Sequence, residues 1–195
     1  MKKHQNLFRD LQEDFRKMKK NLLVAQSGGP TAAINATLAG VIKQAIKEEQ
    51  IDQVYGACYG IQGVLEQKFV NLTEKVDTEE KLEKLKRTPA AALGSCRFKL
   101  NDIKEDDSQY QEIVDILHKM NIGYFVYIGG NDSMDTVAKL SAYCKEKGVE
   151  DIKVIGGPKT IDNDLCGIIS LAAACKMRYT IKEKDSHDHF WREDP

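Results

Sequence analysis

One stretch decides the fold of this chain: residues 156–164 read Gly-Gly-Pro-Lys-Thr-Ile-Asp-Asn-Asp. It follows an apolar run at residues 152–155, which we expect to be a buried strand that ends there. The two glycines let the backbone approach a ligand closely, and the proline fixes the direction in which the chain leaves. Lys159 can hold a polyanion, while Asp162 and Asp164 can accept a proton or bind a metal ion.

Two other expected strands end in a similar way. The apolar run at 21–26 is followed by Ser-Gly-Gly-Pro at 27–30, and the run at 124–128 by Gly-Gly-Asn-Asp-Ser at 129–133. A glycine-rich turn before a helix binds anions because its free N–H groups and the helix dipole point the same way, although one such turn alone fits a tight turn without a ligand equally well. Three such strand ends together favour a shared polyphosphate crevice.

The repeat of strand, Gly-Gly turn and helix predicts a doubly wound α/β fold, with a mainly parallel sheet and helices on both faces. Ligands of such sheets lie outside the carboxyl ends of the strands. Further expected elements are a strand at 53–59 and helices at 78–86 and 108–120. Ser108 and Gln111 have the spacing of a capping box, and we expect Ser133 to cap the helix that follows the second turn.

The composition narrows the class of protein. A chain of 195 residues with 42% hydrophobic residues predicts one domain with a real core, and its net charge of −1 gives no reason to expect nucleic acid or a membrane as partner. Five cysteines without a C-x-x-C pair favour free thiols and a cytoplasmic location. No G-x-G-x-x-G follows a strand, and residues 157–160 carry proline where a Walker A loop needs glycine.

Four motifs, in this order and rough spacing, resemble those of the phosphofructokinase family, most closely its pyrophosphate-dependent branch. They are Ser-Gly-Gly-Pro at 27–30, Leu-Gly-Ser-Cys-Arg at 93–97, Ile-Gly-Gly-Asn-Asp-Ser at 128–133 and Pro-Lys-Thr-Ile-Asp-Asn-Asp at 158–164. The resemblance implies a Rossmann-like domain that transfers a phosphoryl group from pyrophosphate to the 1-hydroxyl of fructose 6-phosphate, using Mg²⁺. It also implies a homo-oligomer in the complete enzyme.

The last motif would supply the acceptor side of the reaction. Asp162 resembles the general base that takes the proton of the sugar hydroxyl. Thr160 and Ile161 lie beside it in the sugar-phosphate site that the resemblance implies. Asp164 looks like a supporting catalytic carboxylate, and Lys159 would stabilise the transferred phosphoryl group.

The earlier motifs would hold the donor. The resemblance assigns Gly28, Gly29 and Gly130 to the donor phosphates, together with Arg97, for which an ordinary surface arginine is the alternative. Asn131 stands at the magnesium position, where the family usually has aspartate. It keeps an oxygen ligand but loses a charge.

Two residues predict the choice of donor. ATP-using members of the family carry glycine in the places of Asp132 and Lys159. The Asp132 side chain would fill the space of a nucleotide α-phosphate and repel its charge, and the Lys159 ammonium would stabilise the phosphoryl group during transfer. Pyrophosphate is therefore the expected donor, with an ATP-dependent 6-phosphofructokinase as an alternative.

The chain divides into three expected regions: an amphipathic helix at 1–20, a phosphofructokinase-like domain at 21–167 and an atypical tail at 168–195. The tail departs from the family pattern and is expected to be disordered or aberrant, with a metal pair at His187 and His189 as the alternative. The family's second domain is expected to be absent, so we expect little turnover from this chain alone. Two other hypotheses stay open: a non-catalytic diphosphate-binding or assembly fragment, and an NAD kinase-type protein, which leaves 158–164 unexplained.

Overall fold

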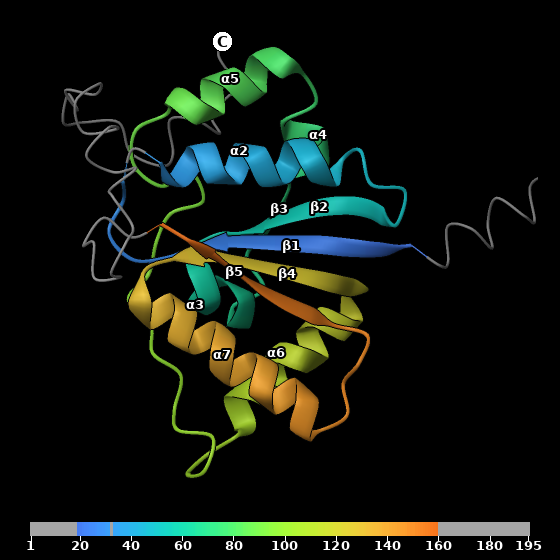
Figure 1. Cartoon of the computed structure of the whole chain (residues 1–195), viewed down its shortest axis with the longest axis vertical. Helices are drawn as coiled ribbons and strands as arrows, with labels where there is room; N and C mark the ends of the chain where they lie inside the picture. The colour runs from blue at the N-terminus through green and yellow to red at the C-terminus, as the bar shows by residue number, and fades with distance from the viewer. Residues whose placement is uncertain (1–18, 32, 160–195) are drawn as a thin grey trace, which may run out of the picture.

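The computed structural model of the chain describes residues 19–31 and 33–159. Its elements are β1 (Lys20–Gln26), α2 (Ile34–Ala45), β2 (Ile51–Ala57), α3 (Gly60–Leu65), β3 (Phe69–Asn71), α4 (Leu72–Lys75), α5 (Glu79–Arg87), α6 (Ser108–Lys119), β4 (Ile122–Gly129), α7 (Asn131–Glu146) and β5 (Lys153–Pro158) (Figure 1). The helix expected near the N-terminus and the tail expected at 168–195 lie outside the described residues, apart from Lys20, which begins β1.

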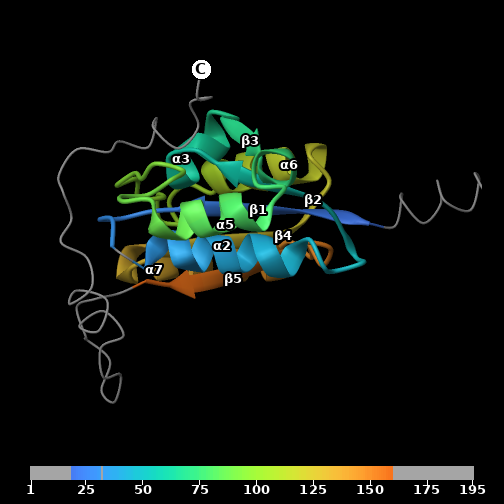
Figure 2. The same cartoon turned by 90° about the horizontal axis from the view of Figure 1, so that it is seen from above.

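A five-stranded sheet in the order β3-β2-β1-β4-β5 forms the centre of the molecule. β1 pairs in parallel with β2 on one side and β4 on the other, β5 continues in parallel beyond β4, and only the short β3 is antiparallel. Helices α2, α4 and α5 lie on one face of the sheet and α3, α6 and α7 on the other (Figures 1 and 2). The predicted doubly wound α/β fold is confirmed.

Burial explains why the central strands are apolar on both faces. Side chains alternate along a strand, so Leu23 and Ala25 enter one core cluster while Leu22 and Val24 enter the other. Because helices cover both faces at β1, every position from Leu22 to Gln26 is buried.

The expectation of a buried strand at 152–155 is wrong. β5 is an edge strand of the described sheet and pairs with β4 alone in this part of the chain, so that Ile155 is 49% exposed. Gly156 and Gly157 do not form a turn after the strand; they lie within it, paired with Tyr127 and Ile128. Gly156 lies where α7 packs: a Cβ there would stand 2.6 Å from the Met134 sulfur, so that side chain would have to shift.

Two predicted helix caps are also wrong. Asp107 is the N-cap of α6 and no side chain caps it, so Ser108 and Gln111 form no capping box. Gly130 is the N-cap of α7, again without a side-chain cap, and Ser133 bonds elsewhere. Short-range spacing alone cannot detect a competing partner from another strand, which is what the Ser133 hydroxyl has.

The segment between β2 and α5 holds more structure than its polar composition predicts. α3, β3 and α4 were not expected, since each is six residues or shorter and has little room to show a period. Asn71 caps α4 with its side-chain oxygen, and Thr78 caps α5, whose predicted range is confirmed to within a residue at each end.

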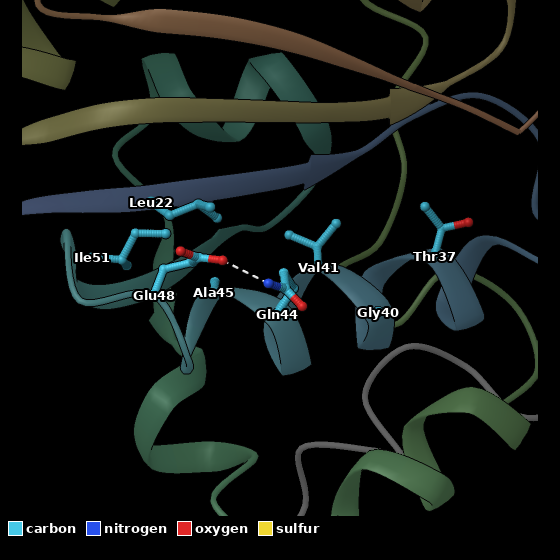
Figure 3. Close-up of a pocket in the computed structure, with 8 residues that line it drawn as sticks. All are labelled: Leu22, Thr37, Gly40, Val41, Gln44, Ala45, Glu48 and Ile51. Carbon is cyan, nitrogen blue, oxygen red and sulfur yellow. Dashed lines mark hydrogen bonds between the residues drawn. The ribbon is translucent and has the colours of Figure 1, made fainter.

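An apolar groove runs along α2 toward the amino ends of the strands, with a volume of about 450 Å³ (Figure 3). Its lining includes Leu22, Val41 and Ile51, and the hydrogen bond from Gln44 to Glu48 lies at its polar margin. The groove is far along the sheet from the carboxyl ends, where the sequence predicts the site. In the described ranges no helix is long and apolar enough to cross a membrane.

Candidate functional site

The strand order makes the carboxyl ends of β1 and β4 a topological switch point, where open α/β sheets have a ligand crevice. From β1 the chain passes to β2 on one side and later returns to β4 on the other side of β1. The connections that leave β1 and β4 therefore run in opposite directions along the sheet. Ligands of open α/β sheets bind at such a switch point. The Ser27 N–H donates to the Ile128 carbonyl at 2.9 Å, which carries the pairing of the two strands up to the first glycine turn.

The first turn, after β1, depends on glycine. Gly28 has φ +78°, a left-handed conformation that other residues rarely adopt. Its N–H donates to the Cys96 carbonyl at 3.3 Å, and its own carbonyl accepts a hydrogen bond from the Ser95 hydroxyl. Gly29 is exposed, with no atom within 4 Å of where a Cβ would stand. The turn therefore presents open backbone to the crevice while the 93–97 segment supports it from behind.

The second turn, after β4, leads into the N-terminus of α7. Gly130 has no atom within 4 Å of its Cβ position, and Asn131 and Asp132 are exposed in the first turn of the helix. Since no side chain caps α7, its first N–H groups and its dipole favour an anion at this position. An uncapped helix of 16 residues behind an open glycine turn is suited to binding a phosphate group.

Buried hydroxyl groups join the two turns. The hydroxyls of Ser27 and Ser133 are hydrogen-bonded at 2.6 Å across 106 positions of sequence. Both serines are nearly inaccessible to solvent, at 6% and 3% exposure. The pair connects the end of β1 directly to the first turn of α7.

Lys159 spans the crevice from a third strand. Its N–H donates to the Gly129 carbonyl at 3.0 Å, and its ammonium donates to the Gly29 carbonyl. Its Cε and Nζ atoms lie 3.2 Å from where a Cβ on Gly28 would stand, so the end of the lysine side chain packs closely against this turn. Lys159 therefore contacts both Gly-Gly turns, the first with its ammonium and the second with its backbone N–H, although the Gly156–Gly157 pair is itself part of β5.

Two polar side chains that the sequence analysis missed hold this region together. The Gln26 side chain donates to Asn35 and accepts from the Leu93 N–H at 2.9 Å. Asn35 donates to the carbonyls of Thr88 and Ala90, each at 2.8 Å. The sequence does contain a sign of both residues, because each is an amide at a position where the pattern predicts a buried apolar side chain. Gln26 ends an apolar run, and Asn35 lies on the apolar face of α2.

Arg97 is carried by the same segment. Gly94 turns the chain with φ +70°, packed against the Tyr59 ring, and the Tyr59 N–H donates to the Leu93 carbonyl. The Arg97 side chain is exposed and makes no ion pair with any residue in the ranges described. Cys96, its neighbour, contacts the first turn through its carbonyl, so Arg97 is held next to that turn by one peptide unit.

The remaining predicted site residues, Thr160, Ile161, Asp162 and Asp164, lie outside the described residues. For the donor side, the structure brings Gly28, Gly29, Gly130 and Lys159 to one edge with Asn131 and Asp132. One buried polar atom in the described chain has no hydrogen-bond partner, the Thr31 hydroxyl just after the first turn. An unpartnered buried donor beside a crevice fits a site that a polar ligand completes.

The side chains at this site offer the type of ligand atom that Mg²⁺ prefers, but few of them. Asn131 and Asp132 offer neighbouring oxygen atoms at the rim of the crevice, and Mg²⁺ takes few protein ligands beside water and phosphate oxygens. Among residues 19–31 and 33–159 there is no group of three histidine, cysteine or carboxylate side chains that could hold a metal by itself.

Tyr127 contributes a neutral hydroxyl beneath the crevice. Burial raises the pKa of Tyr127 strongly. The phenol therefore keeps its proton at physiological pH. The Ile61 N–H lies 3.4 Å from the phenol oxygen and points to it.

The comparison with protein families gives a match to phosphofructokinase over residues 21–171. A pyrophosphate–fructose 6-phosphate 1-phosphotransferase of Rhodospirillum rubrum is 43% identical over 147 residues, which is 75% of this chain and 34% of that protein. The chain thus spans about a third of the length of the curated relatives it matches.

Solved structures give the same match. The crystal structure of a pyrophosphate-dependent phosphofructokinase from Nitrosospira multiformis is similar with a TM-score of 0.68 and 38% identity, covering 75% of this chain and 35% of that one. The enzyme of the same description from Marinobacter aquaeolei matches with a TM-score of 0.66 and 40% identity, covering 76% of this chain and 35% of that one.

Proposed function

Because this chain belongs to the phosphofructokinase family, we propose that its crevice binds pyrophosphate and serves phosphoryl transfer to the 1-hydroxyl of fructose 6-phosphate. The observation that carries the proposal is Lys159, which contacts the glycine turns after both β1 and β4. A cation placed between two open backbone turns suits a small, highly charged anion better than an extended ligand.

The donor fits between the turns. Gly28, Gly29 and Gly130 offer backbone without side chains, and Lys159 would exchange its bond to the Gly29 carbonyl for one to a phosphate oxygen. Asp132 is exposed at the start of α7, where its charge would repel a further phosphate of a nucleotide. The similarity to pyrophosphate-using relatives supports this choice of donor.

The acceptor side rests on the resemblance. Asp162 would take the proton of the sugar hydroxyl, with Thr160 and Ile161 in the sugar-phosphate site and Asp164 in support. Arg97 would contact the donor phosphates through its guanidinium group. Asn131 and Asp132 would lie nearest to Mg²⁺, which when bound supplies charge neutralisation for the phosphates. The cytoplasm stays our predicted location, in keeping with the free thiols of Cys58, Cys96 and Cys144.

Calorimetry on the 195-residue chain with Mg²⁺ and either pyrophosphate or ATP tests the donor. Lys159→Met should weaken pyrophosphate binding on the order of 10-fold or more, since a charge-assisted hydrogen bond contributes about 1.5–3 kcal/mol. Lys153→Met is the matched control, because it removes the same charge from the exposed start of the same strand. The double variant Asp132→Gly with Lys159→Gly should lose pyrophosphate binding and gain binding of ATP.

A coupled assay for fructose 1,6-bisphosphate on the same protein distinguishes an active enzyme from a protein that only binds diphosphate. Turnover with pyrophosphate supports the full proposal. Binding without turnover supports the second candidate, a diphosphate-binding or assembly fragment. ATP bound in preference to pyrophosphate would contradict the proposed donor, and failure to bind either would contradict the crevice itself.

A further inference from the structure

We propose that residues 1–18 of this chain bind, as an amphipathic helix, to an apolar surface beside α2 that we call the open face. The open face combines the groove along α2 with the neighbouring part of β4 and β5 on the same side of the sheet, and its members include Leu22, Val41, Ile51, Tyr124 and Ile155. The groove extends toward the amino ends of the strands, away from the crevice, so pyrophosphate binding plays no part in this docking.

The groove lies along one flank of α2. Thr37, Val41, Gln44 and Glu48 recur in its lining at helical spacing, along the side of the helix shown in Figure 3. The other flank of α2 packs against α5 and carries Asn35, which bonds to the segment that follows α5. The lining flank therefore faces the opposite way along the sheet, toward β4.

The sheet beside the groove is incompletely covered in the described part of the chain. Tyr124 pairs with Leu22 of the groove, and its hydroxyl donates to the Gln50 side chain at 3.1 Å. Val126 belongs to the core cluster on the α2 side, and its partner Ile155 points to that same side because paired residues of parallel strands share a face. Ile155 is nevertheless 49% exposed. A large aliphatic side chain exposed next to an apolar groove marks a surface that another segment covers.

The segment that precedes β1 matches this surface in pattern and length. Leu7, Leu11, Phe15 and Met18 recur at helical spacing, which gives a helix here one apolar stripe. From the first to the last of these residues the helix would span about 16 Å, and the lining from Thr37 to Glu48 covers the same number of positions.

The point of attachment sets the direction of the segment. It joins β1 at Lys20, so a helix that ends there and covers the open face runs antiparallel to β1 and alongside α2. In a right-handed helix with its stripe on the sheet, Phe8 then lies on the flank toward α2, while Asp10 and Asp14 lie on the flank toward β5. Lys153 is exposed at the start of β5, so the charges are complementary along this flank.

Thiol alkylation in the full chain tests whether the open face is covered, with peptide mass spectrometry to separate introduced from native cysteines. Ile155→Cys reports on the open face. Ile46→Cys is the matched control, because Ile46 is also 49% exposed among the described residues but does not line the groove. We expect Ile155→Cys to react on the order of 10-fold more slowly, since a docked segment must open before the reagent enters. Equal rates would overturn the proposal.

Leu11→Asp identifies the occupant, because it places a charge in the apolar stripe. It should raise the reaction rate of Ile155→Cys to that of Ile46→Cys. Asn6→Asp adds the same charge on the polar side of the segment and should leave the rate low. A rate that stays low in Leu11→Asp would show that something other than residues 1–18 covers the open face, which would contradict the proposal.

Photo-crosslinking gives a second readout that needs no disruptive change. A benzophenone side chain placed at Phe8 should crosslink to residues 37–48 within one chain, and the same group placed at Arg9, on the polar side, should not. Crosslinks between two chains would make a second copy the occupant, and equal crosslinking from both positions would exclude a fixed orientation; either result overturns the proposal. Because pyrophosphate is absent throughout, failure of the proposed donor leaves these outcomes unchanged.

Discussion

At the scale of single residues, the glycines of the site differ in what they do. Gly28 is required for its backbone conformation, Gly129 for the space that the serine hydroxyls fill, and Gly130 for neither. In the Gly-Gly pairs after β1 and β4, the first glycine is required by the backbone conformation or by a close neighbour, and the second leaves room for a ligand.

Gly129→Ala should destabilise the protein by about 3 kcal/mol, because the added methyl meets the Ser133 hydroxyl at 2.0 Å and its Cβ at 2.3 Å. Gly130→Ala should change the unfolding free energy by less than about 0.5 kcal/mol, since its φ of −87° suits any residue and the space is open. Urea unfolding of both variants measures this contrast. Equal losses would show that the serine pair is not packed as described.

At the scale of elements, the strands and the main helices follow from local pattern. The runs that became β1 and β4 were predicted because residues buried on both faces are continuously apolar, and α7 because its apolar residues recur at helical spacing before Gly148. β5 was placed in the right position but given the wrong environment, because an apolar run does not reveal whether a strand has one neighbour or two.

The loop that carries Arg97 is held by Asn35 rather than by its own sequence. Asn35→Ala removes the acceptor of the Ala92 N–H at 2.9 Å and two donors to the carbonyls of Thr88 and Ala90. We expect a loss of about 3 kcal/mol or more in unfolding free energy, because several buried backbone groups lose their partners at once.

Asn101→Ala is the control for that change, because Asn101 is an exposed asparagine whose side chain bonds only to Asp106 among the described residues. It should cost less than about 1 kcal/mol. Faster hydrogen exchange at Leu93 and Gly94 in Asn35→Ala, and not in Asn101→Ala, would locate the effect. A small loss in Asn35→Ala would mean that the loop is anchored elsewhere.

At the scale of the whole molecule, ion pairs connect distant segments at the amino ends of the strands, opposite the crevice. Asp151, just before β5, pairs with Lys20 of β1 and with His118 of α6, each at 3.1 Å. These contacts tie three distant segments together at the amino ends of the strands. They are partly exposed, so we expect them to contribute little stability individually.

Asp151→Asn should lower the unfolding free energy by less than about 1 kcal/mol at neutral pH. The hydrogen bond from His118, followed by that from Lys20, holds the pKa of Asp151 below its usual range, so the contribution is present above the unfolded pKa of about 4 and is lost as pH falls through the folded value. The two unfolding curves should therefore converge as pH falls below the folded pKa of Asp151. Glu112→Gln is the control for the loss of one carboxylate charge, because Glu112 is exposed on α6.

The sequence by itself determined the fold class and the family, and it predicted the edge of the sheet at which we propose the site, because apolar periodicity and glycine turns are local and the four motifs are specific. The tertiary structure alone decided which groups meet there. Ser27 bonds to Ser133 across 106 positions, and Lys159 reaches Gly29 across 130. Such contacts depend on strand order, which puts β1 between β2 and β4, and no local pattern encodes the neighbours of a strand.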